Sequence, residues 1–182
     1  DAYNIDRKPH IIIEGSVDYS FKPQQSNRLP SPKIIMYAGT IEEQYGFDAF
    51  VKAFMTIEQP DIELHIYGNG KFVDTLLEYQ KKDIRIKYKG VVTNEEIIVA
   101  EQEASLLVNP RYSNQEFVKY SFPSKTSEYM LSGTPVLTTK LSGIPEEYFQ
   151  HLYTFDDETI EGYAHKLNEI LSLPHEELKQ KG

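Results

Sequence analysis

The chain has no cysteine and no tryptophan among its 182 residues. Without cysteine it can form neither disulfides nor thiolate metal sites, and this absence fits a reducing cytoplasm. No run of apolar residues approaches the roughly 18 that a transmembrane helix needs, so we expect no membrane span. The five histidines are scattered without a metal-binding spacing, and we expect no metal site.

Positive charge is also scarce, with 19 Lys and Arg residues against 28 Asp and Glu residues and a formal net charge of −9. A nucleic-acid surface needs concentrated Lys and Arg, so nucleic acid is not an expected partner. The balance still leaves room for a local basic site that binds a phosphate. Neither G-x-G-x-x-G nor the phosphate loop G-x-x-x-x-G-K followed by Ser or Thr occurs, which weakens NTPase and dinucleotide-binding interpretations.

The hydrophobic content of 40% and the charged content of 26% are normal for one globular domain of this size. Apolar, β-rich runs alternate along the chain with amphipathic stretches at helical spacing. The runs predict strands at 34–38, 63–67, 84–88, 106–108, 135–139 and 152–155. The amphipathic stretches predict helices at 47–57, 72–79, 93–103, 124–132 and 160–171, with a last helix opened by Pro174.

Strand–helix alternation with short glycine-containing turns predicts a parallel sheet covered by helices on both faces. We therefore expect residues 33–182 to form a Rossmann-like, doubly wound α/β domain. Such domains bind ligands beyond the carboxyl ends of their strands, so functional residues are expected in the loops 39–46, 68–72, 90–94, 110–126 and 140–146. Residues 1–32 are predicted to be an interdomain segment or linker, with an apolar run at 11–13 as a candidate strand.

The stretch 120–146 carries the most information about function. Phe122-Pro123-Ser124 forms a loop, and Ser124 or Thr126 is expected to cap the helix that follows, which ends at Gly133. That helix carries Lys125 and, one turn later, Glu128. A helix start and a lysine suit a phosphate, and a carboxylate suits ribose hydroxyls, so the pattern favours a nucleotide.

The same stretch resembles the donor-binding segment of GT-B glycosyltransferases of the "glycosyl transferases group 1" type, grouped in family 4. Further segments resemble that family in the same order and at similar spacing: Y-A-G-T-I-E-E-Q-Y-G-F-D-A-F-V-K-A-F (37–54), L-H-I-Y-G-N-G (64–70), I-K-Y-K-G-V-V (86–92) and the region 95–110 ending in A-S-L-L-V-N-P. Each segment is weak alone, because α/β proteins contain many strand–glycine turns. Together they cover roughly residues 33–172.

The resemblance implies that this chain is the C-terminal, nucleotide-sugar donor-binding half of a GT-B fold. It implies donor contacts at Gly39, Thr40, Ser124, Lys125, Thr126 and Glu128, with Arg111 and Tyr120 as further candidates. Gly39 also suits a strand end, and glycine lets a backbone approach a phosphate closely. The substrate would be a UDP or GDP sugar, with no separate cofactor and no metal, and the catalytic residues stay unassigned.

Three positions depart from the family pattern. Thr40 and Tyr45 stand where the family usually has an Arg and a Lys that contact the donor diphosphate, and Tyr120 stands where it has the first of two glutamates. Lys125 is therefore the cation expected to compensate near the helix start. Arg111, after Pro110 at a strand exit, suits a donor contact and a surface position equally well.

The function implied is a retaining glycosyltransferase acting on a glycan or lipid-linked acceptor held by an absent N-terminal domain, in cell-surface polysaccharide synthesis. The resemblance further implies a cytoplasmic location and allows peripheral association with the inner face of the membrane. The fragment alone is expected to bind a nucleotide without turnover. Two alternatives stay open: a sugar-nucleotide epimerase of GT-B fold, whose acid/base residues the sequence does not identify, and a non-catalytic nucleotide-binding module.

Overall fold

The computed structural model describes residues 31–119 and 123–181. Its centre is one six-stranded sheet in the order β3-β2-β1-β4-β5-β6, and all neighbouring strands run parallel. The strands are β1 (Lys33–Ala38), β2 (Ile62–Tyr67), β3 (Ile86–Gly90), β4 (Leu106–Asn109), β5 (Val136–Thr139) and β6 (Tyr153–Phe155). The predicted Rossmann-like α/β fold is thereby confirmed.

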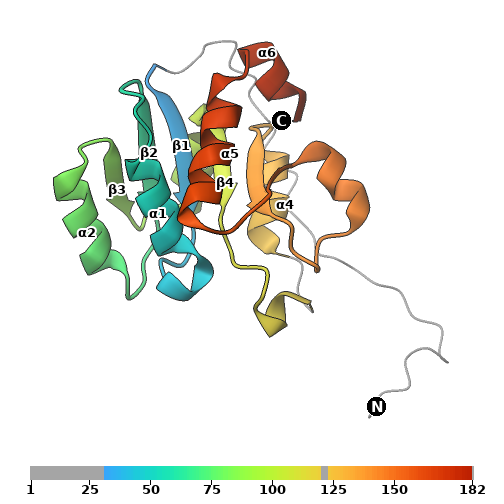
Figure 1. Ribbon diagram of the computed structural model, residues 1–182, viewed down its shortest axis with the longest axis horizontal. Coiled ribbons are helices and arrows are strands. Elements are labelled where there is room, and N and C mark those ends of the chain that lie inside the picture. Colours follow the sequence, from blue (N-terminus) through green and yellow to red (C-terminus); the bar gives the residue numbers. More distant parts are fainter. Residues whose placement is uncertain (1–30, 120–122, 182) are drawn as a thin grey trace.

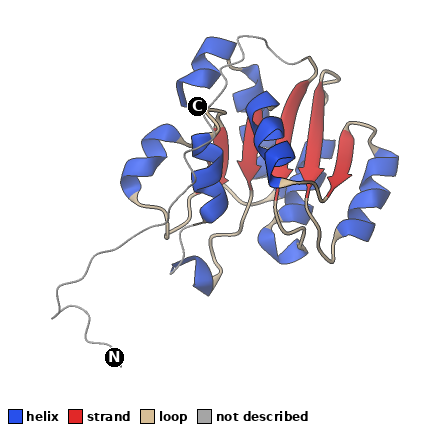
Figure 2. Cartoon of the chain, turned by 180° about the vertical axis from the view of Figure 1, so that it is seen from behind, coloured by secondary structure: helices blue, strands red, loops and turns tan. Residues whose placement is uncertain are grey.

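Helices cover both faces of the sheet (Figures 1 and 2). One face packs against α1 (Phe47–Met55), α2 (Val73–Lys82), α5 (Ile160–Ser172) and the short α6 (His175–Leu178). The other packs against α3 (Asn94–Glu103), α4 (Ser124–Leu131) and the 3₁₀ segment η4 (Glu146–His151). Within the described residues, three more 3₁₀ segments lie in the connections and at the C-terminal end: η2 (Glu43–Tyr45), η3 (Glu116–Lys119) and η5 (Lys179–Lys181).

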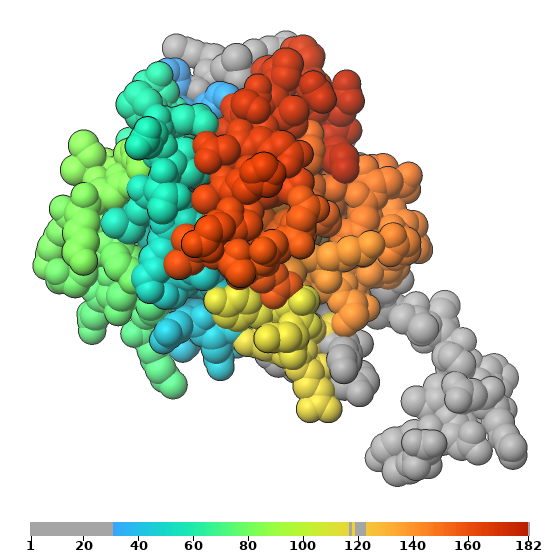
Figure 3. Space-filling view, in the orientation of Figure 1, coloured from blue at the N-terminus to red at the C-terminus, as the bar shows by residue number. Residues whose placement is uncertain are grey.

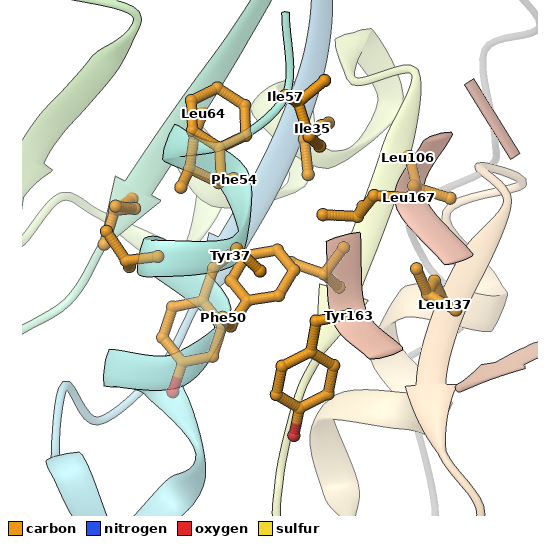
Figure 4. Close-up of a cluster of buried hydrophobic side chains, with 14 of the residues drawn as sticks. Ile35, Tyr37, Phe50, Phe54, Ile57, Leu64, Leu106, Leu137, Tyr163 and Leu167 are labelled. Carbon is orange, nitrogen blue, oxygen red and sulfur yellow. The ribbon is translucent and has the colours of Figure 1, made fainter. Parts of the chain in front are cut away.

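The central strand β1 is buried on both sides because its successive side chains point to opposite faces. Ile35 and Tyr37 belong to the larger core cluster, while Met36 and Ala38 belong to the cluster on the opposite face. Figure 4 shows the larger cluster, in which Phe50 of α1 lies near Leu167 and Tyr163 of α5. This two-sided burial explains why the strand reads as a continuous apolar run.

The chain reverses its winding direction between β1 and β4. It adds β2 and β3 on one side of β1, then returns and adds β4, β5 and β6 on the other. Pairing of β1 with β2 continues to Ala38 opposite Tyr67, but pairing with β4 ends at Met36 opposite Leu107. The two central strands therefore separate toward their carboxyl ends, which opens a crevice at the topological switch point.

The observed elements match the predicted ones closely, with one clear difference at the start of β3. The sequence predicts this strand from position 84, whereas it begins at Ile86 and Ile84 is 80% exposed. The Asp83 carboxylate accepts hydrogen bonds from the backbone N–H and the guanidinium of Arg85, which holds residues 83–85 in a turn. A local polar turn thus overrides the apolar pattern.

The predicted cap at Thr93 is confirmed: its hydroxyl accepts from the Glu96 N–H and the Glu96 carboxylate accepts from the Thr93 N–H, a complete capping box. Three predictions concern residues that lie outside the described ranges. They are the candidate strand at 11–13, the predicted linker except for positions 31 and 32, and the donor contact at Tyr120. Among the helices that the structure describes, none has the length and apolar character to cross a membrane.

Candidate functional site

A pocket of about 350 Å³ lies at the switch point. It is bounded by the end of β1 and its following loop, by the end of β4 and its following loop, and by the first two turns of α4. The lining residues are Tyr37, Ala38, Gly39, Thr40, Tyr45, Asn109, Arg111, Pro123, Ser124, Lys125 and Tyr129. Ligands of doubly wound folds bind at this position, so the pocket is the candidate site.

Tyr129 of α4 completes the backbone hydrogen bonding of β1 where β4 has separated from it. Its buried hydroxyl accepts from the N–H of Ala38 at 2.8 Å and donates to the carbonyl of the same residue at 3.2 Å. Burial raises the pKa of this hydroxyl, so it stays neutral and serves both roles. The contact fixes α4 over the open end of the sheet.

Replacing Tyr129 by phenylalanine is expected to destabilise the fold by about 2 kcal/mol, because the Ala38 N–H loses its partner in a buried setting. Urea denaturation followed by circular dichroism measures the change. Tyr153→Phe is the matched control, since its hydroxyl contacts the carbonyls of Glu177 and Leu178 at 3.2 and 3.3 Å from a more exposed position. Equal losses in the two variants would contradict the role assigned to Tyr129.

The start of α4 differs from the prediction. Neither Ser124 nor Thr126 caps it: the N-cap residue is Pro123, in an extended conformation, and no side-chain cap hydrogen bond forms among the described residues. Ser124 is already helical and exposed at the pocket, while Thr126 is buried, with its hydroxyl 3.4 Å from the Asn109 amide nitrogen. The Thr126 N–H donates to the Pro123 carbonyl at 2.9 Å. The amides of Ser124 and Lys125 before it belong to the part of a helix that has no intrahelical acceptor, so this uncapped start can donate hydrogen bonds to a ligand.

The pocket is basic within an acidic protein. Arg111 and Lys125 line it, and no Asp or Glu is among the described residues that do so. The chain as a whole carries a formal charge of −9. Two cations and an uncapped helix start thus face one cavity without a carboxylate in its lining, an arrangement that favours an anionic ligand.

Lys125 and Glu128 form an ion pair, with 2.5 Å between the ammonium nitrogen and the carboxylate oxygen. They are three positions apart on α4 and therefore lie on one helix face. Glu128 itself is not among the lining residues. The structure thus brings together Gly39, Thr40, Arg111, Ser124 and Lys125, and it places Glu128 at the next turn, bound to Lys125.

The loop after β2 supports the loop after β1 at the edge of the pocket. The N–H of Ile41 donates to the Asn69 carbonyl at 2.9 Å, and the Gly39 N–H donates to the Tyr67 carbonyl at 3.0 Å. Gly68 and Gly70 pack so closely that a Cβ on them would lie 1.9 Å and 2.1 Å from backbone oxygens of the loop after β1. Glycine is therefore required here for close backbone approach, a role that the sequence does not reveal beyond a turn.

Glu101 of α3 is a buried carboxyl beside the Lys125–Glu128 pair. It is 3% exposed, and its Oε1 atom has no hydrogen-bond partner among the described residues. Burial raises its pKa to about 7, against the opposing effect of Lys125, while Glu128 adds to the rise. This residue does not stand out in the sequence, where it reads as one of several acidic positions on an amphipathic helix.

The sequence prediction also missed several uncharged residues of the pocket lining: Tyr37, Ala38, Asn109, Pro123 and Tyr129. Their signal was present only as position, because each lies at a strand end or in the first turns of α4. No group of three or more acidic or histidine residues that could hold a metal occurs in the described ranges 31–119 and 123–181.

Comparison with known structures finds the same fold in several proteins. The C-terminal domain of the glycosyl transferase group 1 family protein LpcC from Francisella tularensis superposes with a TM-score of 0.72 at 21% identity, over 91% of this chain and 92% of that one. The catalytic domain of cholesterol-alpha-glucosyltransferase from Helicobacter pylori gives 0.64 at 18% identity, over 82% and 94%. Anabaena HepE, in complex with UDP and glucose, gives 0.59 at 14% identity, over 82% and 41%.

These identities establish the fold alone, and the search of curated proteins finds no match. The family model described as glycosyl transferases group 1 matches residues 18–182, which is most of the chain. The order of the strands and the position of the pocket agree with that match. The chain therefore belongs to the glycosyl transferases group 1 family.

Proposed function

We propose that this domain binds the nucleoside diphosphate part of a sugar donor, as half of a retaining glycosyltransferase active in cell-surface polysaccharide synthesis. One observation carries the proposal: Arg111, Lys125 and the uncapped start of α4 face a single pocket that has no carboxylate in its described lining. A diphosphate is the donor group that needs such a setting, because negative charge develops on it as the glycosidic bond breaks.

The carboxylate of Glu128, beside the pocket, suits the ribose of the donor. Glu128, one turn beyond Ser124 on α4, is proposed to accept hydrogen bonds from the ribose hydroxyls. Lys125 then exchanges its contact with Glu128 for a phosphate or shares itself between the two. HepE was solved with UDP and glucose, which supports a uridine diphosphate sugar as the first candidate.

The acceptor is proposed to bind outside this domain. The chain spans 41% of HepE, so a whole enzyme of that size contains further residues that can form an acceptor site. A glycan or a lipid-linked glycan at the inner face of the membrane is the acceptor class that we propose. The isolated domain should accordingly bind nucleotides without transferring sugar.

Titration of the domain with UDP, GDP and ADP tests the proposal. A dissociation constant of about 0.1–1 mM corresponds to a binding free energy of about 4–5.5 kcal/mol. At a ligand concentration ten times that constant, binding adds about 1.4 kcal/mol to the stability. The melting temperature should then rise by about 3–6 °C for at least one of these nucleotides.

Two variants assign the contacts within the same titration. Lys125→Ala should weaken the best-bound diphosphate at least 10-fold and leave its free nucleoside within about twofold, because the nucleoside has no phosphate. Glu128→Gln should weaken both ligands. Lys81→Ala is the matched control, since Lys81 pairs with Glu78 at 2.6 Å on α2, away from the pocket. Absence of binding by any of the three diphosphates at 5 mM would refute the donor-binding function.

A further inference from the structure

One wall of the pocket is formed by a cation stacked on an aromatic ring. Arg111, two residues beyond β4, holds its guanidinium carbon 4.9 Å from the ring centroid of Tyr45, the last residue of η2. Both residues line the pocket. They lie 66 positions apart in the sequence (111 minus 45), so their contact exists only because the loops after β1 and β4 meet.

The backbone under this pair is tightly held. The side-chain amide of Gln115 donates to the Gln44 carbonyl, which ties the two loops together. The hydroxyl of Tyr163 donates to the Pro110 carbonyl at 3.0 Å, directly before Arg111. Figure 3 shows the loop after β4, in yellow, packed against α5 and the loop after β1 at the lower edge of the molecule.

The next loop contact leaves no room for adjustment. Gly46 has a φ of +75°, and a Cβ there would lie 2.2 Å from the Pro110 carbonyl oxygen. The two loops thus meet backbone to backbone immediately beside Tyr45 and Arg111. A side chain rooted in such a segment has few alternative directions, and the stacked ring restricts the guanidinium further.

A stacked guanidinium is well suited to one kind of ligand. Stacking on a ring involves the face of the guanidinium and not its in-plane N–H groups, whose planar fork matches two oxygens of one phosphate. Lys125 reaches the same pocket from α4 as a point charge, on a different element of the fold. Two cations from separate elements are best satisfied by a ligand with two linked anionic groups.

We infer that Arg111, supported by the ring of Tyr45, binds one phosphate of the donor and gives the pocket its preference for a diphosphate over a monophosphate. The inference rests on the proposed donor-binding function. It adds the role of each residue: Arg111, from the loop after β4, and Lys125, from α4, both contact the diphosphate, and Tyr45 positions Arg111 without contacting phosphate itself.

The test compares UDP with UMP, and GDP with GMP, by isothermal titration on the same preparations. Arg111→Ala should weaken binding of the diphosphate about 10- to 100-fold and binding of the monophosphate less than threefold. The variant should therefore lose most of its preference for the diphosphate over the monophosphate. Arg111→Lys keeps the charge but not the planar fork and should give an intermediate loss. Tyr45→Ala should weaken the diphosphate about two- to fivefold through loss of the stacking support.

A double variant that moves the positive charge from position 111 to position 45 makes the test specific. Adding Tyr45→Lys to Arg111→Ala places a cation at the neighbouring position and should recover at least a third of the lost affinity, expressed as the logarithm of the dissociation constant. Lys140→Ala is the matched control, because the Lys140 ammonium lies 5.1 Å from the ring centroid of Phe149 and Lys140 is not among the described residues that line the pocket. It should change neither ligand.

The possible outcomes distinguish a failure of this inference from a failure of the proposed donor-binding function. If wild-type protein binds a diphosphate and Arg111→Ala leaves the ratio of diphosphate to monophosphate affinity unchanged, the inference fails and donor binding stands. If wild-type protein binds none of UDP, GDP and ADP, both the inference and the donor-binding function fail. Far-ultraviolet circular dichroism and the melting temperature of each variant show that a lost affinity is not lost folding, and Arg111→Lys carries the test if Arg111→Ala does not fold.

Discussion

Gly68→Ala is expected to lower the free energy of unfolding by about 3–5 kcal/mol. Gly68 has a φ of +125°, and an added Cβ would lie 1.9 Å from the carbonyl oxygen of Gly39. The obstacle is backbone rather than the end of a flexible side chain, so the two strand-exit loops must move apart. Chemical denaturation with urea measures the loss.

Gly90→Ala separates the two causes. Gly90 also has a positive φ, +73°, but no heavy atom lies within 4 Å of the Cβ that would be added. Its substitution should therefore show backbone strain alone, about 1 kcal/mol. If both variants lose the same stability, close packing of the two loops is not what requires glycine at position 68.

Because Gly39 lines the pocket, Gly68→Ala should also weaken nucleotide binding in whatever fraction remains folded.

Glu101→Gln is expected to stabilise the protein increasingly as pH rises from about 5 to 8. The folded-state pKa of Glu101 is raised from 4.5 to about 7 by burial, so the unfolded chain binds fewer protons than the folded one between these values. Stability of the wild type therefore falls with rising pH in that window, by up to about 3 kcal/mol, and changes no further above it. A neutral glutamine removes this dependence.

The measurement is the difference in unfolding free energy between wild type and variant at pH 5, 6, 7 and 8. Glu103→Gln is the control, because Glu103 is an exposed residue at the end of the same helix. The charged groups that act on Glu101 are Lys125 and Glu128, both on α4. A pH-independent difference for Glu101→Gln would show that the carboxyl is not buried as described.

The order of strands and helices was determined by the sequence alone, because it depends on local patterns. Apolar runs such as 34–38 record burial on both faces of a strand, and the spacing of Phe47, Phe50, Val51 and Phe54 records one buried helix face. The capping box at Thr93 is likewise local, since its partners are three residues apart. The sequence also indicated which loops lie at the carboxyl ends of the strands, and so where the pocket would be.

What only the tertiary structure decided concerns residues far apart in the chain. The contact of Arg111 with Tyr45, the burial of Glu101 beside Lys125, and the approach of Gly68 to Gly39 each join segments that share no local pattern. Burial and charge at these positions depend on how the loops after β1, β2 and β4 meet α4 at one edge of the sheet. Local propensity records a residue's own backbone state, whereas the surroundings that decide its chemistry are set by the packing of distant segments.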